Sequence, residues 1–194
     1  MTATNDELFA FHLGIVVADL EATTALYGRL LDIPKWHFRE TDVLALPWNP
    51  STTDGHIRIA HGRTPGQTLE LIQPDGGETF ASIFLREHGE GVQHLGFWVP
   101  ELQVAIMRLV ERGATLSHGN FRRDGSGYAQ LSAGSPMTAI LAALDAGRPA
   151  FVDPGLGSLQ IELAGPAVTQ LQRRSMGADF PNVIELPPWP DFGA

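Results

Sequence analysis

Two histidines and two glutamates occupy matching places in two copies of one short pattern. FHLGIVV at 11–17 recurs as QHLGFWV at 93–99, and LEL at 69–71 recurs as IEL at 161–163. His12 and His94 are 94 − 12 = 82 positions apart, whereas Glu70 and Glu162 are 162 − 70 = 92 apart. The repeat predicts one module used twice, with about ten extra residues in the second copy. A two-fold axis between the copies would bring all four side chains together.

These four residues lie within apolar runs that are typical of strands. Strands place alternate side chains on opposite faces, so each histidine shares its face with a glycine, Gly14 or Gly96, which leaves space above the sheet. A carboxylate in an apolar strand is costly to bury unless it is paired or binds a metal. Taken singly, each histidine could be a hydrogen-bonded core residue and each glutamate could face solvent. Their matched positions favour a site for one divalent ion: zinc, nickel, cobalt, manganese or iron.

The composition describes a compact domain and excludes several other kinds of site. With 194 residues, 43% of them hydrophobic, the chain is long enough for a sizeable core. Its net charge of −9 argues against a nucleic-acid partner, which would require a basic face. The absence of cysteine excludes disulfides and thiolate sites. Because no apolar run is long enough to span a bilayer and no signal pattern begins the chain, we expect a cytoplasmic protein without a membrane partner.

The first copy is predicted to contain a strand, a helix and three more strands. The strands are expected at 10–17, 36–41, 56–60 and 67–72, and turn residues follow at 74–77. Helical spacing begins at Leu20, and Asp19 is placed to cap that helix. This pattern defines a first module over 9–77.

The second copy repeats the order after a predicted linker helix at 79–87. Its strands are expected at 92–99, 115–121, 150–153 and 159–163, and a helix runs from Pro100 to Gly113. An additional helix, with Ser135 as N-cap and Pro136 as first residue, is predicted at about 135–147 and has no counterpart in the first copy. We therefore divide the chain into a linker at 78–90, a second module at 91–164 and a proline-rich C-terminal extension at 165–194.

The module order, with histidine in the first strand and glutamate in the last, resembles the vicinal oxygen chelate superfamily over about residues 9–164. EHGEGVQHLGF at 87–97 is similar to the Gly-Glu-Gly-x-x-His stretch of methylmalonyl-CoA epimerases, and SLQIEL at 158–163 is similar to their terminal ligand strand. Glyoxalase I shares this ligand pattern. The resemblance implies an α+β fold in which two tandem βαβββ modules form a cupped mixed sheet around a metal site. The implied metal ligands are His12, Glu70, His94 and Glu162.

The expected activity is that of a metal-dependent isomerase or epimerase, or of a glyoxalase-like lyase. The metal would polarise a substrate carbonyl and stabilise an enediolate. Glu162 would carry the proton, with Glu70 opposite as a second catalytic carboxylate. We expect a small-molecule carbonyl or acyl substrate and a homodimer. The insert helix is expected near the mouth of the cup, where it would influence substrate choice.

Two other classes of protein remain open. An extradiol-type iron(II) dioxygenase would use two histidines and one carboxylate, so a fourth ligand, Glu70, speaks against it. A metal-free small-molecule binding protein would lack the ligand set.

The remaining histidines and several other candidates are interpreted as structural. No repeat partner is evident for the other five histidines, which we interpret as surface or loop residues. They are His37, His56, His61, His88 and His118. The arginine pairs at 122–123 and 173–174 are interpreted as solvated surface charge.

Overall fold

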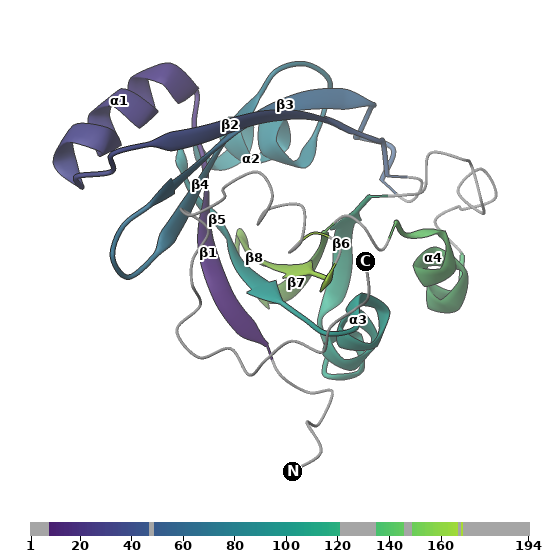
Figure 1. Ribbon diagram of the computed structural model, residues 1–194. Helices are drawn as coiled ribbons and strands as arrows, with labels where there is room; N and C mark the ends of the chain where they lie inside the picture. Colours follow the sequence, from purple (N-terminus) through teal and green to yellow (C-terminus); the bar gives the residue numbers. More distant parts are fainter. Residues whose placement is uncertain (1–7, 47–48, 121–134, 146–148, 167, 169–194) are drawn as a thin grey trace, which may run out of the picture.

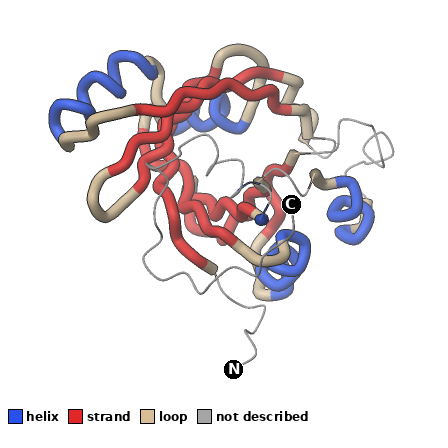
Figure 2. The backbone as a smooth tube through the Cα atoms, in the orientation of Figure 1, coloured by secondary structure: helices blue, strands red, loops and turns tan. Residues whose placement is uncertain are grey.

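The computed structural model describes residues 8–46, 49–120, 135–145, 149–166 and 168. Within these residues it contains one curved eight-stranded sheet and four helices (Figures 1 and 2). The strands lie in the order β2-β3-β4-β1-β5-β8-β7-β6. Their bounds are β1 Phe9–Val16, β2 Trp36–Val43, β3 Gly55–Arg63, β4 Thr68–Pro74, β5 Gly91–Trp98, β6 Thr115–Gly119, β7 Ala150–Leu156 and β8 Leu159–Ala164. The helices are α1 Leu20–Leu30, α2 Phe80–His88, α3 Leu102–Glu111 and α4 Met137–Ala143.

The sheet is mixed, and its pairing is symmetric about the junction of β1 and β5. These two strands pair antiparallel, while β1 pairs parallel with β4 and β5 pairs parallel with β8. Strands β1–β4 thus form one half of the sheet and β5–β8 the other, with equivalent strands at equivalent positions. The predicted α+β fold with a cupped mixed sheet is confirmed. The exact division into modules at 9–77 and 91–164 stays a prediction.

Local sequence explains where the helices of the two halves begin and end. The Asp19 carboxylate accepts a hydrogen bond from the Ala22 backbone N–H and caps α1, as predicted. Thr79 and Ser82 form a reciprocal capping box at the start of α2. After α3, Gly113 adopts a φ of +103°, which suits glycine and ends the helix.

The helices cover the sheet unequally. Helix α1 packs against the outer face of the first half, where Ile15, Ala60 and Leu71 are buried, and α3 packs against the outer face of the second half. Helix α2 instead packs on the inner face of the first half, against Ile59 and Ile72. This arrangement leaves the inner face at the centre of the sheet to polar side chains. No helix in the described ranges is long and apolar enough to cross a membrane.

The insert helix differs from its prediction in length and in place. It spans Met137–Ala143, with Pro136 rather than Ser135 as N-cap. Its Ile140 and Leu141, together with the C-cap residue Leu144, join the apolar cluster beneath α3, on the outer face of the sheet. The expectation that this helix lies near the mouth of the cup is therefore wrong, because its apolar side chains are buried on the opposite side of the sheet. The rest of the insert and the extension beyond 168, including both arginine pairs, lie outside the described residues.

Candidate metal centre

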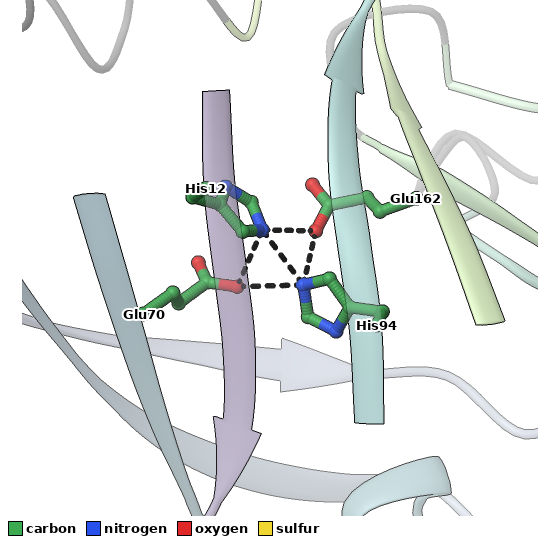
Figure 3. Close-up of side chains that lie close together, drawn as sticks. All are labelled: His12, Glu70, His94 and Glu162. Atoms are coloured by element: carbon green, nitrogen blue, oxygen red, sulfur yellow. Dashed lines mark hydrogen bonds and ion pairs between the residues drawn. The ribbon is translucent and has the colours of Figure 1, made fainter. Parts of the chain in front are cut away.

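His12, Glu70, His94 and Glu162 point toward one another from four adjacent strands, β1, β4, β5 and β8 (Figure 3). One ligand atom from each lies within 4.8 Å of all the others. The two histidine Nε2 atoms are 2.7 Å apart. Glu162 Oε2 is 3.0 Å from His12 Nε2 and 2.8 Å from His94 Nε2, and Glu70 Oε2 is 3.4 and 3.2 Å from the same two atoms. All four side chains are buried.

Strand register explains why these side chains converge. One row across the sheet runs Glu70–Gly14–His94, and the next runs Glu162–Gly96–His12. Each row therefore combines a glutamate of one half with a histidine of the other half.

The glycine in each row makes room for a histidine ring. A Cβ added at Gly14 would lie 2.0 Å from the His94 ring, and one at Gly96 would lie 2.6 Å from the His12 ring. The space predicted above the glycines is therefore present. It is filled by the histidine of the other half, which no spacing within a single copy could reveal.

A β-bulge precedes each histidine, because Phe11 on β1 and Gln93 on β5 are left out of the strand pairing. The His94 Nδ1–H donates to Gln93 Oε1 over 2.6 Å, and Gln93 is buried. This bond orients the ring and leaves Nε2 toward the centre. Phe11 instead packs edge-on against His12, with ring centroids 4.2 Å apart. His12 Nδ1 is buried without a hydrogen-bond partner among the described residues.

The two glutamates also differ in their surroundings. Glu70 Oε1 accepts a hydrogen bond from Arg39 Nη2 over 3.2 Å. It also lies 2.8 Å from His61 Nε2, at ion-pair distance but outside hydrogen-bond geometry. Within the described residues, the Glu162 carboxylate is in hydrogen-bond or ion-pair distance of His12 and His94 alone. Glu70 is therefore restrained from its outer side, whereas Glu162 is held only from the centre.

His61 and His118 correct the interpretation of the remaining histidines as surface or loop residues. Both are buried, at 4% and 3% exposure, on strands β3 and β6. A repeat partner also existed in the sequence: His37 and His118 are 118 − 37 = 81 positions apart, close to the 82 between the central histidines. His37 lies two strands from Glu70, and His118 lies two strands from Glu162.

The electrostatics keep both carboxylates ionised. Burial alone would raise the pKa of Glu162, but the adjacent His12 and His94 outweigh burial and lower it to about 2. Glu70 is likewise held well below its usual pKa, because His12, His61 and His94 outweigh burial. Burial would lower the pKa of His94, but hydrogen bonds to both glutamates raise it to about 9.

The donor set fits a divalent ion. Two imidazole nitrogens and two carboxylate oxygens converge in a buried site, and the second nitrogen of His94 is already held by Gln93. Ligand atoms around a tetrahedral zinc are about 3.3 Å apart, given bonds of about 2.0 Å. The two Nε2 atoms lie 2.7–3.4 Å from each other and from the two Oε2 atoms, which is close to that spacing. These four buried residues could form a metal site.

Comparison with known proteins places the chain in one superfamily. Residues 11–129 match the model of the Glyoxalase/Bleomycin resistance protein/Dioxygenase superfamily, and the chain belongs to that superfamily. The predicted membership of the vicinal oxygen chelate superfamily is thus confirmed. No curated protein matches the chain significantly.

Solved structures agree with this assignment. Methylmalonyl-CoA epimerase from Mycobacterium tuberculosis is 26% identical, with a TM-score of 0.51 over 82% of this chain and 88% of that one. A hypothetical protein from Bacillus halodurans C-125 is 18% identical, with a TM-score of 0.50 over 82% and 95%. A mutant of 4-hydroxymandelate synthase from Streptomyces coelicolor is 21% identical, with a TM-score of 0.52 over 84% and 51%. The last two similarities concern the fold alone.

Proposed function

We propose that this protein is a metal-dependent isomerase or epimerase, or a glyoxalase-like lyase, that moves a proton at a carbon next to a carbonyl. The observation that carries the proposal is the convergence of four buried donor atoms within 4.8 Å of one another. The 26% identity to a methylmalonyl-CoA epimerase supports this type of reaction.

In this proposal His12, Glu70, His94 and Glu162 hold one divalent ion, which could be zinc, nickel, cobalt, manganese or iron. When bound, the ion supplies a Lewis acid that stabilises negative charge on the substrate oxygen. Burial of the four side chains excludes bulk water, which strengthens every electrostatic interaction in the site.

The two carboxylates have different tasks in the proposed reaction. Glu162 takes and returns the substrate proton, because no described side chain restrains its outer oxygen. Arg39 and His61 hold Glu70 from outside, so it serves mainly as a ligand and as the opposing carboxylate. Because Glu70 points inward and is only 3% exposed, the site offers four donors rather than the three of a dioxygenase triad.

We further propose a small-molecule carbonyl or acyl substrate, a homodimer and a cytoplasmic location. The division into modules at 9–77 and 91–164, a linker at 78–90 and an extension from 165 is part of the same proposal. The pairing of equivalent strands about β1 and β5 supports the two modules.

Metal analysis tests the site directly. The protein, purified without chelator and reloaded, should contain about one divalent ion per chain, and His94→Ala should lose most of it. A wild-type protein that stays empty after reloading would show that there is no metal site.

Isotope exchange tests the reaction. In D₂O, the metal-loaded protein should introduce deuterium at the α-carbon of its substrate without consuming oxygen. Methylmalonyl-CoA and the hemithioacetal of glutathione and methylglyoxal are the first two compounds to assay. Stoichiometric oxygen uptake without α-deuteration would instead identify a dioxygenase.

A further inference from the structure

His118 on β6 is a buried imidazole, 3% exposed. Neither Nδ1 nor Nε2 makes a hydrogen bond to a residue that the structure describes. Within the described part of the chain it is the only side chain with two such buried, unpaired nitrogens. Buried polar groups are nearly always hydrogen-bonded, so an imidazole with two nitrogens that lack a hydrogen-bond partner requires an explanation.

The position of His118 connects it to the candidate metal centre. Strand register runs His118–Phe151–Glu162, so all three side chains lie on the inner face of the sheet. His118 therefore lies two strands from Glu162, a backbone separation of about 9.5 Å. The Phe151 ring lies between His118 and His94. Its centroid is 5.5 Å from that of the His118 ring and 5.1 Å from that of the His94 ring.

The surroundings of His118 are apolar. Phe80 lies at the start of α2. The centroid of its ring is 4.8 Å from that of the His118 imidazole and 5.2 Å from that of the Phe151 ring. Burial lowers the pKa of His118 to about 4, against the smaller opposing effect of Glu162. The ring is thus neutral at pH 7 and can offer one donor and one acceptor.

The first half of the sheet places polar side chains directly beside its carboxylate. There the position equivalent to Phe151 is occupied by His61, which reaches Glu70. In the second half a phenyl ring occupies that place, so His118 has no polar neighbour between it and the carboxylate. The second half thus places, beyond Glu162 on the inner face, two packed aromatic rings and an imidazole without a hydrogen-bond partner among the described residues.

We propose that His118 is a substrate-binding residue that hydrogen-bonds a neutral polar group, such as a hydroxyl or an amide, at the far end of the substrate. The apolar or aryl body of that substrate lies against Phe80 and Phe151, and its carbonyl lies at the metal centre. This proposal rests on the proposed function, because the centre defines which end of the substrate reacts. It assigns the substrate class: a carbonyl compound with an apolar body and an uncharged polar end.

A matched pair of chelating probes tests this assignment. Benzohydroxamate and 4-hydroxybenzohydroxamate share a metal-binding group and a ring, and they differ by one hydroxyl at the far end. Calorimetric titration of the zinc-loaded full-length protein should show about tenfold tighter binding of the hydroxylated probe, the effect of one buried hydrogen bond. His118→Phe should remove this preference and leave the affinity for benzohydroxamate nearly unchanged.

Two further variants control the experiment. His118→Gln, which keeps a donor and an acceptor, should retain part of the preference. His37→Phe alters the histidine at the equivalent position of the first half and should retain all of it.

The melting temperature distinguishes ligand binding from a structural role. Removing two unmet polar atoms in His118→Phe should raise the melting temperature of the ligand-free protein, by about 2–4 °C. A lowered melting temperature with an unchanged preference would identify His118 as a structural residue and overturn the proposal. Equal affinity of the wild-type protein for the two probes would overturn it as well, and would leave the metal centre intact. Failure to bind zinc would instead remove the proposed function and this assignment together.

Discussion

The two halves of the sheet present the same two donor types, one imidazole and one carboxylate each, but support them with different side chains. In the first half, Arg39 and His61 hold the outer oxygen of Glu70. In the second half, an amide side chain, Gln93, holds the outer nitrogen of His94. Each half thus restrains one of its two candidate ligands and leaves the other, His12 or Glu162, without an outer polar partner among the described residues.

This difference shows which features of a duplicated module are tied to its symmetry. The glycine–histidine–glutamate rows must match, because each glycine accommodates a ring from the other half. The outer partners are under no such constraint, since each contacts a ligand of its own half. The symmetric rows therefore determine where an ion could bind, while the asymmetric partners determine how the two carboxylates and the two histidines differ.

The largest expected effect is a difference in catalytic rate between variants of Glu162 and of Glu70. Glu162→Gln should slow α-deuteration in D₂O by about two or more orders of magnitude, the scale expected for loss of general acid–base help. Glu70→Gln should slow it less, because Glu70 is restrained by Arg39 and His61. Rates measured by NMR, at metal contents matched between the variants, make the comparison. Equal losses in both would show that the halves share the proton-transfer role.

The next largest expected effect is a difference in zinc affinity between variants beside His94 and beside His12. Gln93→Leu should weaken zinc binding by about 10–100-fold, because the His94 ring loses the partner that orients it. Phe11→Gln, at the equivalent bulge, should strengthen binding by giving His12 Nδ1 a partner. Competition with a fluorescent chelator measures both affinities. Gln93→Glu, which keeps the acceptor, should bind zinc at least as well as the wild type, and a loss equal to that of Gln93→Leu would contradict this role.

A smaller, graded effect should appear with pH. Because the pKa of His94 is raised to about 9, its proton must leave when a metal binds. Metal affinity should therefore fall about tenfold for each pH unit below 9, which titrations at pH 6, 7 and 8 would measure. The stability of the metal-free protein should change with pH in the opposite direction. The raised pKa of His94 stabilises the folded state fully below the ordinary value of 6.5, and this stabilisation is lost as the pH rises through about 9. An affinity independent of pH would contradict the assignment of this proton.

The smallest effect on the centre should come from α4, which only the second half contains among the described elements. Leu141→Ala should lower the free energy of unfolding by about 2–5 kcal/mol, because Leu141 is buried beneath α3. Zinc affinity should not change, since α4 packs on the face opposite the four donors. Leu26→Ala, on the exposed side of α1, is the stability control and should change unfolding by less than about 0.5 kcal/mol. A metal-binding defect in Leu141→Ala would show that the outer layer is coupled to the centre.

Much of the architecture was predictable because it depends on local spacing. The strand and helix order, the Asp19 cap and the α+β class follow from apolar periodicity and from capping chemistry. The four central residues were identified because a repeat preserves their positions, although their role as ligands stays a prediction. The prediction that His118 lies at the surface is wrong, because its burial depends on packing against Phe80 and Phe151, which no local pattern specifies.

What the sequence alone determined is the set of side chains that can face one another, since strand alternation and the repeat are local properties of the chain. Only the tertiary structure decided their neighbours. The rows Glu70–Gly14–His94 and Glu162–Gly96–His12 join residues of different halves, so they depend on how β1 meets β5. The bulge that brings Gln93 to His94, and the packing of α4 on the outer face, depend in the same way on pairing between strands and on shared burial. Those contacts arise between segments far apart in the chain, where no local pattern specifies register or side.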